Sequence, residues 1–269
     1  DTAALTEPMA VALHAVRRSE ITRRQTAIVI GCGPVGLAII CHLKAMGVGA
    51  VIASDFSPAR RALAARCGAH VVVDPAVGSP YERLGKGVVT GAQDLYELGV
   101  GSMEKLRKLP GWAHLYRVAD RLGTAGPKRP VVFECVGVPG MIEGIVAAAP
   151  VSSRVVVAGV CMEPDRFRPA VAGVKEIDLR FVLGYTPLEY RDTLHAIADG
   201  RLHCAPLVTG TVGLAGKASD EISGEQSDAV LRILEGVLVA IGGGEDSEAG
   251  NCGLGQGEDF ELRNIRCVD

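Results

Sequence analysis

Three glycines at fixed spacing are the residues whose pattern most directly predicts a chemical task. Gly31, Gly33 and Gly36 spell G-x-G-x-x-G between an apolar run typical of a strand and one typical of a helix. In this setting the first glycine permits a tight turn, the second lets a pyrophosphate approach the backbone, and the third lets the helix pack closely on the strand. The helix expected from Val35, directly after Pro34, offers free N–H groups and a positive dipole end to phosphates. The pattern predicts a dinucleotide-binding turn.

An acidic residue follows at a suitable distance. Asp55 ends a second apolar run, 50–55, nineteen residues after the last glycine. At this position a carboxylate accepts hydrogen bonds from the adenosine ribose hydroxyls and repels a 2′-phosphate, which favours NAD. NADP stays an alternative, because Arg60 and Arg61 are close enough in sequence to bind a phosphate. The other interpretation is that Asp55 caps the next helix, for which Ser57-Pro58 is already a good start.

The elements that must hold these residues follow from apolar runs and their end signals. The expected strands are 27–30, 50–55, 70–73, 131–135, 154–159 and 177–183, and the expected helices are 8–19, 35–46, 58–67, 140–149 and 187–199. Apolar strands that alternate with helices predict an α/β fold, a Rossmann doubly wound parallel sheet with right-handed crossovers. Six strands in two halves predict the order 3-2-1-4-5-6, with the cofactor across the point where the order reverses.

Composition narrows the class of protein. The chain has 269 residues, of which 48% are apolar and 4% aromatic, enough for one large domain or two small ones. The net charge of −3 gives no sign of a nucleic-acid partner. No apolar run is long enough to span a membrane, and we expect no secretory leader. Eight scattered cysteines without a C-x-x-C pair predict reduced thiols and a cytoplasmic location.

Four segments together resemble one known family. They are Thr6–Val16 (TEPMAVALHAV), Gly31–Gly36 (GCGPVG), Glu134–Gly137 (ECVG) and Pro206–Gly210 (PLVTG). Over about residues 4–215 the chain is similar to the cofactor-binding half of the zinc-type medium-chain dehydrogenases, which include alcohol, sorbitol and threonine dehydrogenases. The resemblance implies hydride transfer between an alcohol and NAD.

The resemblance also implies a nicotinamide side of the site, formed by backbone and apolar groups at later strand ends. The residues that it implies are Cys135, Val136, Gly137, Gly159, Val160, Leu183 and Gly184, with Ala158 next to Gly159. The alternative is that these are ordinary glycine-containing strand ends.

Zinc is implied by the resemblance but is doubtful in this chain. Glu7 matches a position that in several family members lies at the catalytic zinc, whereas the other interpretation is an acid that complements the dipole of helix 8–19. The family's remaining ligands lie on an N-terminal barrel that this sequence does not contain. We expect the six histidines to have structural roles or to lie on the surface. The sequence identifies no catalytic residue.

Two regions depart from the family pattern. The segment between Pro75 and Val131 has 55 residues and predicts a helical hairpin that includes Trp112, Leu115 and Tyr116. It either packs its apolar stripe on the body or serves as a lid or partner surface. Residues 217–269, with 4 basic and 12 acidic residues, are expected to be partly disordered.

These departures give a domain division. The expected parts are an N-terminal segment and helix at 1–25, a dinucleotide-binding domain at 26–204 with an insertion at about 78–128, a remnant of the return to a catalytic domain at 205–216, and a divergent tail at 217–269.

Two functions of different class remain. The first is a dehydrogenase portion for a small-molecule alcohol, aldehyde or ketone, which alone binds NAD with little or no activity. The second is a non-catalytic NAD-binding, regulatory or interaction module. In either case strand 177–183 would be a sheet edge, through which we expect a homodimer or tetramer.

Overall fold

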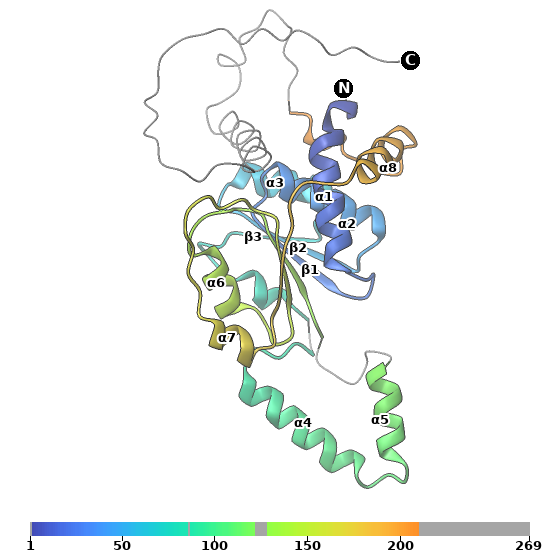
Figure 1. Cartoon of the computed structure of the whole chain (residues 1–269), viewed down its shortest axis with the longest axis vertical. Helices are drawn as coiled ribbons and strands as arrows, with labels where there is room; N and C mark the ends of the chain where they lie inside the picture. Colours follow the sequence, from blue (N-terminus) through green and yellow to red (C-terminus); the bar gives the residue numbers. More distant parts are fainter. Residues whose placement is uncertain (1, 86, 122–127, 210–269) are drawn as a thin grey trace, which may run out of the picture.

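The fold is built on one parallel sheet. The computed structural model describes residues 2–85, 87–121 and 128–209 (Figure 1). Its six strands have the order β3-β2-β1-β4-β5-β6, which confirms the predicted topology. The strands are β1 Thr26–Ile30, β2 Ala50–Ser54, β3 Val71–Val73, β4 Val131–Glu134, β5 Arg154–Val157 and β6 Asp178–Phe181.

Helices cover both faces of the sheet. The α-helices are α1 Thr6–Ser19, α2 Pro34–Met46, α3 Pro58–Cys67, α4 Ala92–Leu106, α5 Trp112–Arg121, α6 Met141–Ala148, α7 Pro169–Val174 and α8 Pro187–Ala198, and the 3-10 helices are η1 Thr2–Leu5, η2 Pro80–Arg83 and η3 Ala205–Leu207. Helices α1, α2 and α3 lie on one side of the sheet and α6 and α7 on the other. None of these helices is long and apolar enough to cross a membrane, as far as the described residues go.

The core has one apolar layer on each face because successive side chains of a strand point to opposite faces. In β1, Val29 packs in the layer under α1 and α2, whereas Ile28 packs in the layer under α6. Both side chains are fully buried. Burial of each stabilises the fold by about 2 kcal/mol, which explains why the central strands are continuous apolar runs.

Helix ends follow local signals. Helix α2 has Pro34 in its first turn and ends at Gly47, whose φ of 70° is left-handed. Helix α3 begins after Ser57, whose hydroxyl accepts a hydrogen bond from the Arg60 N–H. Helix α8 begins with a capping box between Thr186 and Glu189. Because these signals lie within a few residues of each end, the predicted helix bounds agree closely with the structure.

The long connection between β3 and β4 forms a hairpin of α4 and α5 that extends away from the sheet (Figure 1). Leu115 and Tyr116 of α5 are exposed, as are Tyr96 and Met103 of α4. The prediction that this apolar stripe packs on the body is therefore wrong for the described residues. The connection is long enough to carry both helices beyond the sheet that its ends join. Leu122, Gly123 and the tail 217–269 lie outside the described residues.

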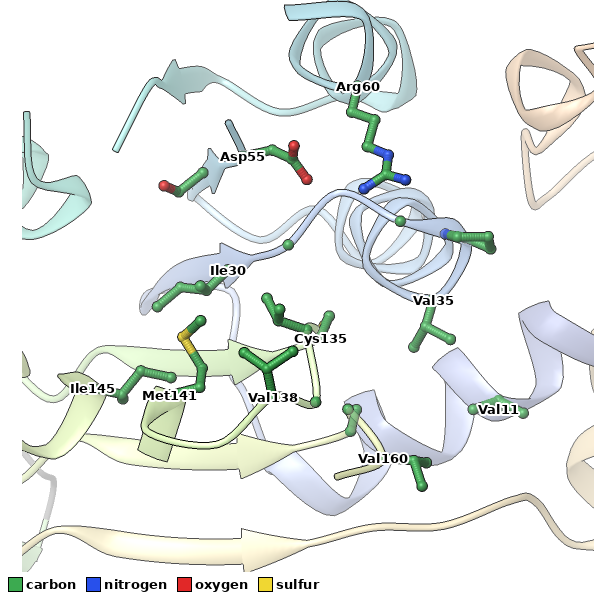
Figure 2. A pocket seen from close by; sticks show the side chains of 18 of the residues that line it. Val11, Ile30, Val35, Asp55, Arg60, Cys135, Val138, Met141, Ile145 and Val160 are labelled. Carbon is green, nitrogen blue, oxygen red and sulfur yellow. The ribbon is translucent and has the colours of Figure 1, made fainter. Parts of the chain in front are cut away.

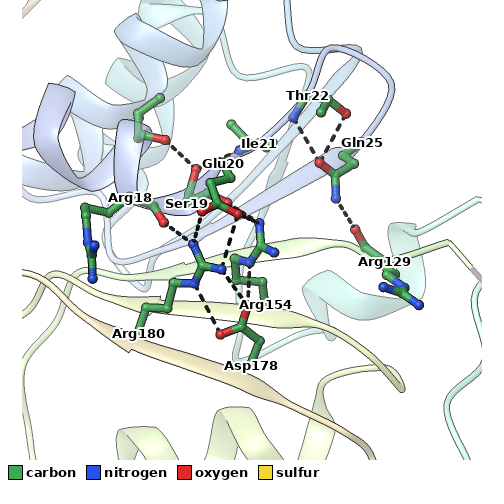
Figure 3. Close-up of polar contacts among 11 residues, drawn as sticks. Arg18, Ser19, Glu20, Ile21, Thr22, Gln25, Arg129, Arg154, Asp178 and Arg180 are labelled. Carbon is green, nitrogen blue, oxygen red and sulfur yellow. Dashed lines mark hydrogen bonds and ion pairs between the residues drawn. The ribbon is translucent and has the colours of Figure 1, made fainter. Parts of the chain in front are cut away.

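At the end of the sheet where strands begin, charged side chains tie three elements together (Figure 3). Arg154 Nε of β5 lies 2.7 Å from Asp178 Oδ2 of β6, and its Nη1 donates to the Ser19 carbonyl at the end of α1 (2.6 Å). Arg180 pairs with both Asp178 and Glu20 at 3.0 Å. Although burial opposes ionisation of Asp178, hydrogen bonds from both arginines lower its pKa. This cluster joins β5 and β6 to α1.

Candidate functional site

A groove of about 1100 Å³ lies at the opposite end of the sheet, where the strands finish (Figure 2). Asp55 and Arg60 line one side of it, while Val11 of α1 and Val160 line the other. The end of β1 and the turn after it lie between the two sides. The groove therefore crosses the point where the strand order reverses, as predicted for a dinucleotide.

The glycine turn has the geometry expected for a phosphate site. Gly31 has a φ of 90°, and its N–H donates to the Ser54 carbonyl at 2.9 Å. A Cβ at Gly36 would overlap the Gly31 carbonyl oxygen, so helix α2 packs directly on the turn. A Cβ at Gly33 would meet no atom within 4 Å, because this glycine faces open space at the groove. Helix α2 has no side-chain cap, which leaves its first N–H groups for an anion.

Asp55 is bound to the same turn. Its side chain is buried, with Oδ2 accepting from the Cys32 N–H at 2.7 Å and Oδ1 from the Ser57 N–H at 2.8 Å. Asp55 also lines the groove, and its carboxylate has lone pairs beyond the two that accept these hydrogen bonds. Ser57, not Asp55, is the cap of α3. The capping alternative for Asp55 is thus wrong, although its contact with Ser57 does shape the start of that helix.

The two arginines near Asp55 have different surroundings. Arg61 is held in place, because its Nη1 donates to the carbonyls of Asp55 and Phe56 at 2.7 Å and its Nη2 pairs with Asp74 at 3.0 Å. Arg60 lines the groove, and its guanidinium forms no hydrogen bond or ion pair with any described residue. Arg60 is therefore the cation that remains available to a ligand.

The other wall of the groove consists of later strand ends. Every residue predicted from the sequence lines the groove except Gly36, which is enclosed by the glycine turn. On this wall Val136, Val160 and Leu183 expose apolar surface, between 41% and 58% of each residue. Such surface suits the face of a flat ring.

A cysteine within the glycine turn is not reactive. Cys32 is fully buried, and burial together with the neighbouring Asp55 carboxylate raises its pKa to about 12. The thiol is therefore protonated at neutral pH and is a poor nucleophile. Cys32 contributes to the site through its backbone N–H, which donates a hydrogen bond to the Asp55 carboxylate.

Glu7 lines the groove from α1, where burial raises the pKa of its carboxyl. In the described ranges, no group of three His, Cys, Asp or Glu side chains lies close enough to hold a metal ion. The described residues by themselves therefore supply no complete zinc site. Two histidines of the same region have other partners: His14 contacts Glu189 at 3.0 Å, and His42 contacts the Met9 carbonyl at 2.8 Å.

Sequence reasoning missed an apolar part of the groove that η2 and α6 form. Pro80 and Tyr81 of η2 and Met141 and Ile145 of α6 line it. The Tyr81 hydroxyl is buried without a partner among the described residues, and burial raises its pKa. The spacing of Met141 and Ile145 is that of one helix face, a signal that indicates burial but not a ligand. The start of η2 has a local signal, Ser79-Pro80, but its place at the groove has none, because that depends on the path of the connection.

Comparisons with known proteins agree on a family. A sequence model described as zinc-binding dehydrogenase matches residues 34–199, more than half of the chain. (R,R)-butanediol dehydrogenase of Bacillus subtilis is 27% identical over 238 residues, which cover 88% of this chain and 56% of the relative. Sorbitol dehydrogenase of Homo sapiens is 26% identical, covering 77% of this chain and 48% of the relative.

A solved structure is similar as well. The crystal structure of 2R,3R-butanediol dehydrogenase from Bacillus subtilis aligns with a TM-score of 0.52 and 27% identity, covering 76% of this chain and 48% of that one. The chain spans about half the length of the curated relatives it matches.

Proposed function

This chain belongs to the zinc-binding dehydrogenase family, and we propose that it is the cofactor-binding portion of an NAD-dependent alcohol or polyol dehydrogenase. In the complete enzyme a hydride would pass between an alcohol carbon and NAD, so the partner is a small alcohol or the matching aldehyde or ketone. The observation that carries this proposal is the groove, where the glycine turn and Asp55 meet at the strand ends. The names of the butanediol and sorbitol dehydrogenases support an alcohol substrate.

The chain's own residues would bind and orient the cofactor, whose nicotinamide ring accepts the hydride when bound. Asp55 would accept hydrogen bonds from the adenosine ribose hydroxyls, and the open face of Gly33 would admit the pyrophosphate. The apolar surfaces of Val136 and Val160 would pack on the nicotinamide side and exclude water.

NAD is proposed over NADP because the Asp55 carboxylate would face a 2′-phosphate. Repulsion between two anions in a half-buried groove disfavours NADP. Arg60 opposes this preference, since its guanidinium is available at the same end of the groove. We therefore expect the chain to bind NAD more tightly than NADP, with a smaller ratio of affinities than the Asp55 carboxylate alone would produce.

Catalysis is proposed to need more than this chain. Glu7 is the one described residue at the groove that matches a metal position of the family, and it has no partner ligands among the described residues. No step can be derived through zinc here. The chain as given is therefore proposed to bind NAD with little or no dehydrogenase activity, and its domain division is proposed to be 1–25, 26–204, 205–216 and 217–269.

A second candidate is a non-catalytic NAD-binding module with an interaction role. The exposed apolar side chains of the α4–α5 hairpin, including Tyr96 and Leu115, favour it. A homodimer or tetramer through the edge strand β6 fits either function, because Phe181 is exposed on that strand. The cytoplasm is proposed as the location, since the described cysteines are free.

Titration of the 269-residue chain with NADH and NADPH, followed by cofactor fluorescence, tests the proposal. We expect saturable binding with NADH the tighter ligand. Arg60→Ala should weaken NADPH binding more than NADH binding, whereas the matched control Arg66→Ala, an exposed residue of α3 outside the groove, should change neither. Absence of saturable binding by the folded chain would refute the proposal. Robust oxidation of butane-2,3-diol or sorbitol by the chain would refute only the claim of low activity.

A further inference from the structure

One buried carboxylate has no role in the function proposed above. Glu134 is the last residue of β4, and it lies beside Ile30, the last residue of β1. It is 1% exposed and does not line the groove. Buried carboxylates need hydrogen-bond partners because an unpaired one is costly, so its partners indicate what it does.

The partners of Glu134 are backbone groups of the turn that follows it. Its Oε1 accepts from the Val136 N–H at 2.6 Å and from the Gly137 N–H at 2.8 Å. In trans peptides the carbonyls of Cys135 and Val136 are consequently directed away from Glu134. One side chain therefore sets the orientation of two successive peptide groups in a turn whose residues line the groove.

The same carboxylate meets the strand end next to it. A Cβ at Gly159 would lie 2.6 Å from Glu134 Oε2, and a Cβ at Gly137 would lie 2.6 Å from the Val160 carbonyl oxygen. The Ala158 and Gly159 N–H groups donate to the Glu134 backbone carbonyl at 2.9 Å. Glu134 thus lies where the turn after β4 and the loop after β5 interlock.

Asp55 provides a counterpart across β1. Asp55 follows β2 and Glu134 ends β4, so the two flank the central strand, and each accepts two backbone N–H groups. A dinucleotide places one mononucleotide half on each side of such a strand. With the adenosine half at Asp55, the second half would lie over the wall that Glu134 organises.

We propose that Glu134 is a positioning residue for the nicotinamide half of the cofactor, acting through the Val136 and Gly137 backbone. This inference rests on the proposed NAD binding. It predicts that loss of the acceptor weakens binding of ligands that carry the nicotinamide ring and spares otherwise identical ligands that lack it. A general role in folding would affect both kinds of ligand alike.

The experiment compares NAD⁺ with ADP-ribose, which lacks the nicotinamide, by calorimetric titration of the 269-residue chain. Glu134→Met has similar volume but no strong acceptor, and it should raise the Kd of NAD⁺ about tenfold while that of ADP-ribose stays within about twofold. Glu134→Gln keeps an oxygen acceptor for both N–H groups, so it should restore most of the NAD⁺ affinity. If Glu134→Met does not fold, Glu134→Asp, whose shorter side chain withdraws the acceptor from the Val136 and Gly137 N–H groups, should give the same selective loss.

The outcomes separate this inference from the function on which it rests. Equal losses for NAD⁺ and ADP-ribose, or no loss for either, would overturn the positioning role while leaving NAD binding intact. Failure of the unaltered chain to bind either ligand would overturn the proposed function and the positioning role together.

Discussion

The two ends of the sheet use the same kinds of polar side chain in opposite ways. Where the strands finish, Asp55 and Glu134 accept hydrogen bonds from backbone N–H groups beside a groove. Where the strands begin, Asp178 and Glu20 pair with arginine side chains. A carboxylate with backbone partners lies at a glycine-containing turn that borders the groove. A carboxylate with arginine partners is held by their side chains, which connect neighbouring elements.

This contrast separates carboxylates that can serve a binding site from carboxylates that serve only the fold. When the partners of an acidic side chain are guanidinium groups, its charge is compensated and its role is to hold neighbouring elements together. An acid that organises backbone at a strand end shapes the surface a ligand meets, even when it does not touch that ligand. Mutations at the end where the strands finish should therefore change ligand affinity. Mutations at the end where the strands begin should change stability alone.

The largest effect is expected at Gly36. In Gly36→Ala the new Cβ would overlap the Gly31 carbonyl oxygen, forcing α2 away from the turn. Overpacking of this kind should lower the free energy of unfolding by about 3 kcal/mol and abolish measurable NADH binding. Urea unfolding and NADH fluorescence measure the two effects. Gly101→Ala in α4, where a Cβ meets no atom within 4 Å, is the control and should be neutral or slightly stabilising. Equal behaviour of the two variants would contradict close packing at Gly36.

A smaller effect, on affinity more than on stability, is expected at Asp55. Asp55→Asn removes the charge that ribose hydroxyls would contact and should weaken NADH binding by about 2 kcal/mol, roughly thirtyfold. Discrimination against NADPH should also diminish, because the anion that repels the 2′-phosphate is gone. Paired Kd measurements for the two cofactors check this. An unchanged ratio of NADH to NADPH affinity would argue against adenosine ribose at Asp55.

At the other end of the sheet, Arg154→Met should act on stability alone. It removes the pair with Asp178 and the hydrogen bond to the Ser19 carbonyl, both at a half-exposed site, so the expected loss is about 1 kcal/mol. The Kd of NADH should stay within about twofold, since the cluster lies away from the groove. If this variant bound NADH much more weakly although its free energy of unfolding was unchanged, the two ends of the sheet would not differ in the way proposed.

The smallest effect is a pH dependence of that same stability difference. The arginines lower the pKa of Asp178 in the folded state, so the stabilisation is present above the carboxyl's unfolded pKa and is lost as pH falls through the folded pKa. The gap in unfolding free energy between the unaltered chain and Arg154→Met should be constant near neutrality and narrow in acid. Urea unfolding of both proteins at several pH values measures it, and a gap that widens in acid would contradict the ion-pair account.

Much of this fold follows from local sequence. Apolar strands, Pro34 at a helix start and Gly47 at a helix end are read within a few residues, so the strand order and most helices were predictable. The spacing of Asp55 from the glycine turn is likewise a local pattern, and the structure places both at one groove.

Other features depend on tertiary placement. The pairing of Arg154 with Asp178 requires the register of β5 against β6, which no single segment encodes. Tyr81 reaches the groove only because η2, near the start of the long connection between β3 and β4, packs beside β2. Glu134 belongs to a motif that was visible in the sequence, but the backbone N–H partners of its side chain were not. The sequence left two arrangements of the α4–α5 hairpin open, because amphipathicity indicates an apolar face without saying what covers it.

The most direct test is a crystal structure of the 269-residue chain with NAD⁺. Our account predicts the adenosine ribose hydroxyls within hydrogen-bond distance of the Asp55 carboxylate, the pyrophosphate over Gly33 at the start of α2, and the nicotinamide against the wall formed by Val136 and Val160. Ordered NAD⁺ in another location, or in this groove with its ends reversed so that nicotinamide lies at Asp55, would contradict it.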